Sequence, residues 1–231
     1  MNIFLIRHGQ ASFGEENYDR LSEKGRLQAE LLSEYLRKNF PEPDLVCMGS
    51  LKRHEETAAP FIRDRKNCST VKDRALDEFT EKLWRDMAVH LRSAHPEFGK
   101  LISVFQKFSG QKTERVKKMF FRLTGIILHS WRSGITPNGN ESWAEFKKKK
   151  TDFLKDISKK NHENIYIFSS GIPLTVMLSD IFGFGSEREM EISLYLWNTS
   201  LSILHSANGK IIPVTVNSIP HLQNSEHWSR V

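Results

Sequence analysis

Short apolar runs that stop abruptly at small or polar residues constrain the fold of this chain more than any other feature. Such runs occur at Ile3–Ile6, within Asp44–Met48 and at Ile165–Phe168, and Val71–Leu76, which contains charged residues, is a further strand candidate. Runs of this length with polar ends are typical of strands that are buried on both faces of a sheet. The sequence therefore predicts a sheet to which these four segments contribute strands.

Helical patterns separate the predicted strands. Apolar residues return at helical spacing from about Glu23 until Pro41 interrupts the pattern, and a second helix is expected over Leu51–Arg65. A third helix, through Leu174–Ile181, follows the strand at 165–168. Strands that alternate with helices indicate an α/β structure whose sheet is mostly parallel.

The last part of the chain predicts a different kind of connection. Ser200–Leu204 and Ile211–Val216 are separated by a short segment that contains Asn208-Gly209, a strong signal for a hairpin turn. An antiparallel pair is therefore expected near this end. Taken together, the patterns predict a three-layer α/β/α fold with a mostly parallel central sheet.

Between about residues 80 and 142 the strand pattern stops. This stretch is long, basic and amphipathic, and it contains neither an internal repeat nor a linker rich in Gly, Pro or Ser. We interpret it as a helical insertion at about 80–142 in a single domain that spans residues 1–231. The charge run Lys147–Lys150 lies among apolar residues at helical spacing, which favours the solvated side of a further helix.

Composition excludes several classes of protein. The chain is 39% hydrophobic and 27% charged, so it can bury a core and is not disordered. Lys and Arg outnumber Asp and Glu by 34 to 28, and the net charge of +6 suits an anionic partner. Two cysteines form no disulfide framework, and no run approaches the ~18 apolar residues of a membrane span. No signal peptide precedes Arg7, so we expect a cytoplasmic protein.

Residues able to bind an anion stand directly after the predicted strands. Arg7 and His8 follow the first strand, Arg53 comes shortly after the second, Glu78 follows the third, and Ser169-Ser170-Gly171 ends the fourth. Ligands of open α/β sheets bind beyond the carboxyl ends of the strands, so these groups are expected to converge. Guanidinium groups match phosphate, imidazole can attack phosphorus, and a carboxylic acid can protonate a leaving oxygen.

The sequence segments around these residues are more specific than the residue types alone. Six segments resemble, in the expected order, the sequence elements of one enzyme family: Leu5–Gln10, Leu21–Ala29, Ser50–Ala58, Leu76–Phe79, Asn140–Ser142 and Asn198–Ser200. The Arg-His-Gly of the first segment resembles the signature of the histidine phosphatase superfamily, which is also called phosphoglycerate mutase-like. The resemblance covers the first 80 residues well and the last 90 more loosely.

The resemblance implies a phosphatase that forms a phosphohistidine. By that resemblance His8 is the nucleophile, Arg7 and Arg53 hold the oxygens of the phosphoryl group, and Glu78 is the proton donor to the leaving oxygen. Such a site needs no cofactor and no metal, because the arginines supply the positive charge. Glu78 needs a raised pKa to begin the reaction protonated.

One departure from the family pattern stands out. Ser170 occupies the position at which the family normally has a second histidine, and a serine brings no positive charge. His221, after the last strand, is a candidate substitute, although a loop-anchoring role is the alternative. Gln10, Ser12 and Gly171, with Ser170, are candidate substrate contacts. His54, where the family usually has a small residue, is interpreted as a packing or surface residue, with contact at the rim of the pocket as the alternative.

Other functions compete with this interpretation. A phosphate-binding module with weak or lost activity is the alternative that Ser170 motivates, and a nucleic-acid binder is disfavoured because no reader motif accompanies the basic charge. Mutase activity is less expected, because Ala11–Asn17 does not resemble the mutase version. The expected partners are a small phosphorylated substrate or a phosphoprotein, with inorganic phosphate as product and no membrane. The insertion would select the substrate.

Overall fold

The computed structural model describes residues 1–12, 19–63, 65, 68–111 and 113–230. The chain forms two compact units. The first contains Met1–Ser12, the described residues up to Glu78, and the chain from Lys149 onward; the second contains Phe79–Lys148. The expected insertion thus corresponds closely to a unit with its own contacts, while the assignment of the whole chain to a single domain stays a prediction.

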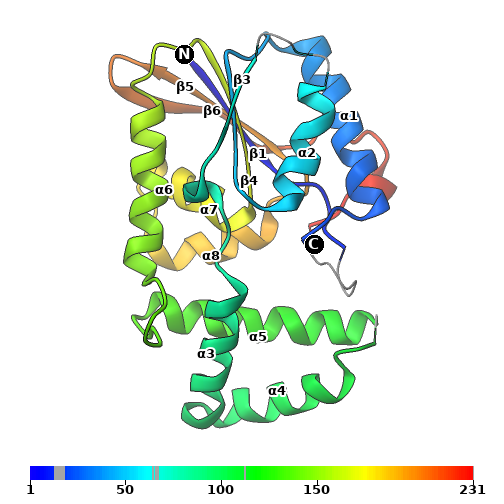
Figure 1. Cartoon of the computed structure of the whole chain (residues 1–231), viewed down its shortest axis with the longest axis vertical. Coiled ribbons are helices and arrows are strands. Elements are labelled where there is room, and N and C mark those ends of the chain that lie inside the picture. Colours follow the sequence, from blue (N-terminus) through cyan, green and yellow to red (C-terminus); the bar gives the residue numbers. More distant parts are fainter. Residues whose placement is uncertain (13–18, 64, 66–67, 112, 231) are drawn as a thin grey trace. The chain divides into compact units, whose positions relative to one another are not determined.

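The first unit is built on a six-stranded sheet with the order β3-β2-β4-β1-β5-β6 (Figure 1). Neighbours among β3, β2, β4 and β1 are parallel, whereas β5 is antiparallel to both β1 and β6. The mostly parallel α/β fold predicted from the sequence is therefore confirmed. The strands are β1 (Asn2–Arg7), β2 (Leu45–Met48), β3 (Ser69–Lys72), β4 (Asn164–Ser169), β5 (Leu201–Ala207) and β6 (Lys210–Ser218).

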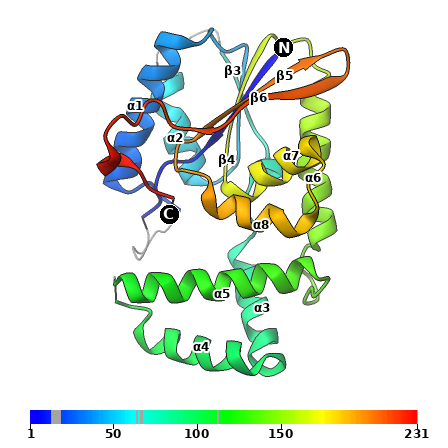
Figure 2. The same cartoon turned by 180° about the vertical axis from the view of Figure 1, so that it is seen from behind.

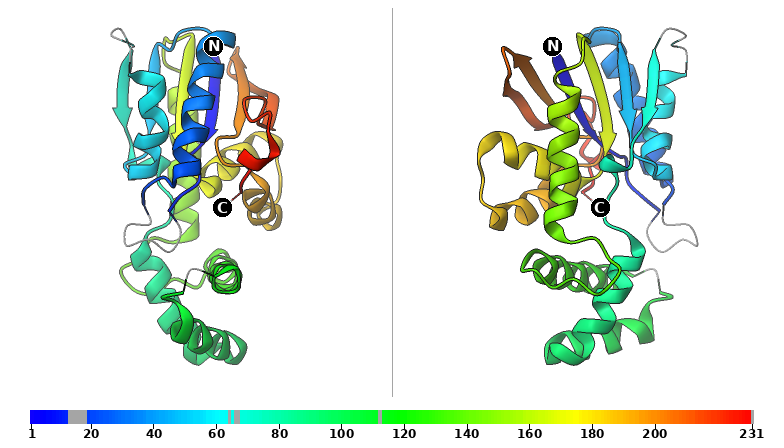
Figure 3. Two further views of the ribbon diagram at one scale, coloured as in Figure 1. Left: turned by 90° about the vertical axis from the view of Figure 1, so that its right-hand side faces the viewer. Right: turned by 60° about the vertical axis from the view of Figure 1, so that its left-hand side comes forward.

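Helices cover both faces of this sheet (Figure 3). Alternate residues of β1 point to opposite faces, as the period of a strand requires. Phe4 and Ile6 pack in one buried cluster with Leu32 of α1, and Ile3 and Leu5 pack in the other with Leu174 of α7. The helices of this unit are α1 (Glu23–Asn39), α2 (Lys52–Ile62), α7 (Gly171–Phe182), α8 (Ser186–Tyr195) and the later part of α6 (Trp143–Ile157).

The hairpin forms at the sheet edge, as the Asn-Gly signal predicts (Figure 2). Asn208 and Gly209 connect β5 to β6 with φ values of 53° and 75°, the positive values that a tight hairpin turn needs. The third strand differs from its prediction, because it ends at Lys72. The Asp73 carboxylate accepts the Ala75 N–H at 2.8 Å and turns the chain into a short 3₁₀ helix over Arg74–Leu76.

The second unit is helical, as predicted. It contains α3 (Glu81–Ala94), α4 (Pro96–Phe108), α5 (Glu114–Arg132) and the start of α6. Thr80 and Thr113 cap α3 and α5 by accepting backbone N–H groups three residues later. The indole N–H of Trp84 donates to Thr124 at 2.9 Å, which joins α3 to α5. Within the described ranges, no helix has the length and apolarity that crossing a bilayer demands.

The loop after β1 lies directly on the first turn of α1. A Cβ atom added to Gly25 would lie 2.1 Å from the carbonyl oxygen of Gln10, and one added to Gly9 would lie 2.6 Å from the carbonyl oxygen of Gly25. Both obstacles are backbone atoms, so neither can rotate away. The absence of side chains at Gly9 and Gly25 therefore sets how closely this loop and α1 approach.

Substituting Gly25 tests this close approach. Gly25→Ala is expected to lower the free energy of unfolding by about 1–3 kcal/mol, because the loop after β1 must move. Gly125→Ala is the matched control within α5: no atom lies within 4 Å of an added Cβ, and helix propensity alone predicts a gain of about 0.5–1 kcal/mol. Thermal unfolding followed by circular dichroism measures both changes. Equal melting temperatures for Gly25→Ala and the unmodified chain would contradict the packing argument.

Candidate active site

Three parallel strands end at the same edge of the sheet. Arg7 of β1 pairs in register with Ser169 of β4, and Met48 of β2 pairs with Phe168. The helices α1 and α7, which follow the neighbouring strands β1 and β4, pack on opposite faces of the sheet. A crevice at such a position is the usual ligand site of open α/β sheets.

His8 is held at this edge through its backbone. Its N–H donates to the carbonyl of Ser169 at 2.9 Å, and its carbonyl accepts from the Thr199 N–H and the Asn198 side-chain amide, each at 3.2 Å. The side chain is buried, and Nδ1 lies 2.7 Å from the carbonyl oxygen of Gly9. A carbonyl oxygen only accepts, so Nδ1 carries the proton and a neutral ring keeps its lone pair on Nε2.

Burial and charge keep this ring neutral. Burial lowers the pKa of His8 well below its usual value, and the charges of Arg53 and Arg7 lower it further, with a smaller contribution from His54. The bond to Gly9 acts in the opposite direction. The charges of both arginines thus act on the His8 ring, and their role in holding a phosphoryl group stays a prediction.

The two guanidinium groups are themselves anchored. Arg53 is buried and donates to the Asp19 carboxylate at 2.7 Å. Arg7 donates to the carbonyl of Leu196. A Cβ atom added to Gly171 would lie 3.6 Å from Arg7 Nε, so the first residue of α7 lies directly beside this guanidinium group.

Glu78 is half-buried and follows a segment that is tied to two strand ends. The Ser169 hydroxyl donates to the carbonyl of Leu76 at 2.6 Å. The Asp77 carboxylate accepts both the N–H and the hydroxyl of Ser50, each at 2.6 Å. These bonds hold the segment that leads into Glu78 beside the ends of β2 and β4, and the role of Glu78 as the acid stays a prediction.

His54 lies deeper in the site than the sequence indicates. Of the roles that the sequence leaves open, packing agrees with a side chain that is 0% exposed and a surface position does not, and the ring centroid lies 5.7 Å from that of His8. Its Nε2 lies 2.7 Å from the Ser170 hydroxyl, which is also fully buried. The signal was present in the sequence as an imidazole one residue after Arg53.

The two candidate contacts on the β1 loop take part in bonds that secure the loop. The Gln10 carboxamide oxygen accepts from Ser22, the N-cap of α1, and the Gln10 N–H donates to Gln28. Ser12 donates its backbone N–H to the carbonyl of Arg20 at 2.8 Å. The roles of Gln10 and Ser12 as substrate contacts stay predictions. The rest of the segment on which the mutase argument depended, residues 13–17, lies outside the described residues.

His221 contacts the turn that holds the backbone of His8. Thr199 donates its hydroxyl to the carbonyl of Asn198 at 2.7 Å and so accepts from His221 Nε2 at 2.9 Å. The Thr199 N–H in turn donates to the carbonyl of His8. His221 is buried, and its contacts join it to the turn that holds the His8 backbone.

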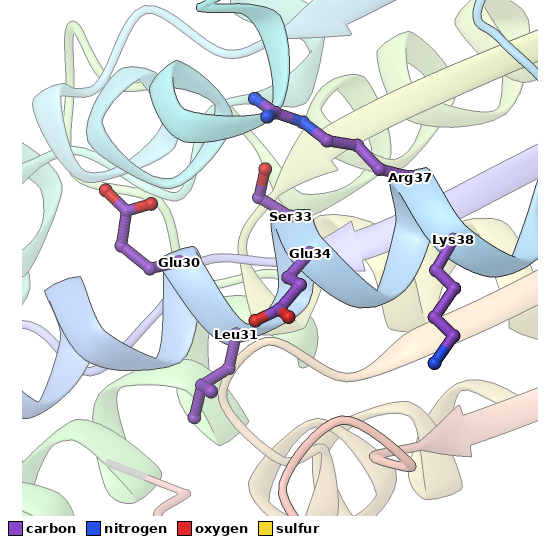
Figure 4. A pocket seen from close by; sticks show the side chains of 6 residues that line it. All are labelled: Glu30, Leu31, Ser33, Glu34, Arg37 and Lys38. Atoms are coloured by element: carbon purple, nitrogen blue, oxygen red, sulfur yellow. The ribbon is translucent and has the colours of Figure 1, made fainter.

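The hollow in Figure 4 lies elsewhere and is formed by one helix. Arg37 donates to the carbonyl of Pro60, and Glu30 pairs with Arg63 at 2.7 Å, so much of its charge is compensated. Its lining residues, all from α1, are Glu30, Leu31, Ser33, Glu34, Arg37 and Lys38. In the described part of the chain, three or more His, Cys, Asp or Glu side chains nowhere gather as a metal site would require.

Known proteins resemble this chain over most of its length. A sequence profile of the histidine phosphatase superfamily (branch 1) matches residues 3–127 and 103–219. A relative from Hydrogenobacter thermophilus, named as a candidate phosphoserine phosphatase 2, is 23% identical over 222 residues, which cover 95% of this chain and 96% of that protein.

Solved structures share the fold. YhfR from Bacillus stearothermophilus matches with a TM-score of 0.68 at 16% identity, over 96% of this chain and 99% of that one. A mutant phosphoserine phosphatase from Entamoeba histolytica, in complex with phosphoserine, matches with a TM-score of 0.63 at 20% identity, over 96% and 98%. At these identities the structural likeness establishes the fold alone.

Burial of His221 predicts that the folded chain loses stability in acid. Burial lowers the pKa of His221 from 6.5 to about 4. The unfolded chain therefore binds this proton first, so the stability that a neutral His221 preserves is intact above pH 6.5 and falls as the pH drops toward 4. The difference of 2.5 in pKa amounts to about 3 kcal/mol in full, of which about 2 kcal/mol is lost by pH 5.

His221→Gln removes this titration and keeps an N–H donor for Thr199. Between pH 7 and pH 5, its free energy of unfolding is expected to fall by about 2 kcal/mol less than that of the unmodified chain. Urea unfolding at several pH values measures both slopes. Parallel slopes would show that His221 is not held neutral by the fold.

Proposed function

The chain belongs to the histidine phosphatase superfamily (branch 1), and on that premise we propose that it hydrolyses a phosphomonoester through a phosphohistidine at His8. The orientation of the His8 ring carries the proposal. Nδ1 donates to the Gly9 carbonyl, so the lone pair of the neutral ring is on Nε2, beside two guanidinium groups. A buried nucleophile flanked by fixed cations suits transfer of a phosphoryl dianion.

In the first step, His8 Nε2 attacks phosphorus and the bond from phosphorus to the ester oxygen breaks. The ester oxygen leaves with its electron pair and takes a proton from Glu78, which releases an alcohol and leaves a phosphoryl group on His8. Arg7 and Arg53 hold the non-bridging oxygens as charge moves toward the leaving group. The bond from His8 Nδ1 to Gly9 keeps the ring aligned while it becomes positively charged.

In the second step, water attacks the phosphohistidine. Glu78, now a carboxylate, takes a proton from that water, the bond from nitrogen to phosphorus breaks, and inorganic phosphate leaves. The electron pair returns to His8 Nε2, which restores the neutral ring. Glu78 is protonated again, so both groups are ready for another cycle.

The relatives support a small phosphorylated substrate. One of the similar structures is a phosphoserine phosphatase in complex with phosphoserine, and the same enzyme has been solved with 3-phosphoglyceric acid. Another is named as a candidate α-ribazole-5′-phosphate phosphatase from Escherichia coli. These compounds share a phosphate ester on a polar carbon skeleton, which is the substrate class that we propose.

The second candidate function is a phosphate-binding module with weak or lost activity. The observation that favours it is Ser170, a neutral hydroxyl at the N-cap of α7. Such a module would bind the anion through the same arginines and turn over slowly. Activity measurements on variants separate the two functions.

Replacing the nucleophile and one arginine tests the mechanism. His8→Ala is expected to abolish hydrolysis of 4-nitrophenyl phosphate, and Arg53→Ala to lower kcat/KM about 10³-fold, since it removes charge that the transition state needs. Arg63→Ala is the matched control, because Arg63 is the C-cap at the other end of the same helix and its side chain is 60% exposed. Released nitrophenolate measures all three variants.

Rapid acid-free quenching adds a direct readout. Alkali-stable, acid-labile label from a ³²P-labelled substrate is expected on the unmodified chain and absent from His8→Ala. Hydrolysis that survives in His8→Ala would refute the proposed nucleophile. Phosphate affinity without measurable hydrolysis would favour the binding module.

Oxyanions are expected to stabilise the folded chain. Vanadate, tungstate or phosphate binds the native site alone, so at 100 times its dissociation constant it adds about 2.7 kcal/mol to the free energy of unfolding. The melting temperature is expected to rise with ligand concentration, and less so in Arg53→Ala. No rise at millimolar oxyanion would count against an anion site at these residues.

A further inference from the structure

A buried polar pair joins two helices that begin at the site. His54 lies on the first turn of α2 and Ser170 at the start of α7; both side chains are 0% exposed, and Nε2 and Oγ lie 2.7 Å apart. The His54 ring centroid is 5.7 Å from that of His8. The pair is therefore joined, through His54, to the imidazole on which the proposed function depends.

The pair also adjoins both arginines. Arg53 directly precedes His54 in the chain, and Gly171, which follows Ser170, lies beside the Arg7 guanidinium group. An anion held by the two arginines against His8 would thus have the Ser170 hydroxyl in its surroundings. Packing alone does not require a polar pair here, because replacing both partners of a buried hydrogen bond with apolar groups is nearly neutral for stability.

The Ser170 hydroxyl does not make the contact that is usual for an N-cap serine. A serine at the N-cap of a helix ordinarily accepts an N–H from the first turn. In the described structure Ser170 makes no such bond, and its hydroxyl contacts His54 instead. The hydroxyl is therefore fixed by a side chain from α2 rather than by its own helix.

The surroundings of the His54 ring determine what the hydroxyl can do. Burial, followed by the charge of Arg53, lowers the pKa of His54, so the ring is neutral and holds one proton. When an anion accepts the Ser170 proton, the His54 proton is on Nε2, which then donates to Ser170 Oγ. Nδ1 carries the lone pair in that state; it lies 3.9 Å from Asp77 Oδ1 and has no hydrogen-bond partner in the described part of the chain. The Asp77 carboxylate accepts from Ser50 instead.

Gly49 makes this arrangement possible. A Cβ atom at this position would lie 2.2 Å from His54 Nδ1 and 2.5 Å from Asp77 Oδ1. The absence of a side chain at Gly49, which follows β2, thus leaves space for the imidazole ring. Gly49 and Asp77 lie on the Nδ1 side of the ring, and Ser170 lies on the Nε2 side.

We propose that His54 and Ser170 form one anion-binding unit, in which the Ser170 hydroxyl donates to an oxygen of the phosphoryl group and His54 positions that hydroxyl. This inference rests on the proposed function, because it assigns the phosphoryl group to the site at His8. Ser170 contacts the substrate in this arrangement, and His54 acts through Ser170.

A double-mutant cycle tests whether the two residues act as a unit. Ser170→Ala and His54→Leu, which fills the space of the ring without a donor, are each expected to lower kcat/KM for 4-nitrophenyl phosphate about 100-fold. Combined, they are expected to lower it no further. Unchanged activity in either single variant, or a combined loss equal to the product of the two, overturns the proposal.

Two further variants separate positioning from packing. His54→Gln keeps an N–H donor for Ser170 and is expected to retain activity within about tenfold, a split from His54→Leu that a packing role would not produce. Ser179→Ala is the matched control for Ser170→Ala, because Ser179 is a buried serine near the other end of α7. It is expected to leave activity unchanged.

Exchanging the two positions adds a rescue. The variant His54→Ala leaves the space of the imidazole ring empty. The further substitution Ser170→His brings an imidazole into that space from α7. The double substitution is expected to recover at least about tenfold in kcat/KM over His54→Ala, by restoring a donor to the anion. A double variant that keeps its melting temperature but recovers nothing overturns the assignment of this space to an anion-binding group.

Tungstate binding distinguishes failure of this inference from failure of the proposed function. If the unmodified chain hydrolyses 4-nitrophenyl phosphate no faster than His8→Ala, the proposed function fails. The pair is then judged on tungstate affinity measured by calorimetry. A dissociation constant about tenfold weaker in Ser170→Ala and His54→Leu supports the unit, and an unchanged constant overturns it.

Discussion

The bond from His8 Nδ1 to the Gly9 carbonyl is the interaction on which the rest of the site depends. It runs between neighbouring residues, so the direction of the ring follows from the backbone of the loop after β1. That loop lies against α1 at a distance that only Gly9 and Gly25 permit. Residues far from the chemistry therefore determine where Nε2 points.

Charge in the site is balanced by groups at helix N-termini. The Lys52 N–H, at the start of α2, and the Arg53 side chain both donate to the Asp19 carboxylate, at 2.8 and 2.7 Å. Leu51, the N-cap of α2, has an apolar side chain that cannot cap, and Ser170 of α7 bonds to His54 instead. The N-terminus of α2 therefore already binds a carboxylate, as the positive end of a helix favours.

The sequence predicted the parts of the molecule that local patterns determine. β1 and β4 were clear because nearly every residue is buried, and the profile match confirms the family that the motifs indicated. The bounds of β3 were predicted wrongly, because all four of its residues are exposed at a sheet edge. The strand therefore has no buried side chains that would mark it in the sequence as an apolar or alternating segment. The contact of His54 with Ser170 could not be predicted for a different reason: the two residues are 116 positions apart, and only the folded chain brings them together.

The location of His54 also bears on how such a site tolerates change. Arg53 and His54 are consecutive residues of α2, so a shift of that helix would move a charge and an imidazole together. Ser170 belongs to α7 and Asp77 follows the 3₁₀ helix after β3, so the surroundings of the ring come from three separate segments. Among the described contacts of the ring, the hydrogen bond to Ser170 is the one that fixes its Nε2. The imidazole beside His8 therefore comes from a helix and not from the residue that directly follows a strand. The space that it fills exists because Gly49 has no side chain.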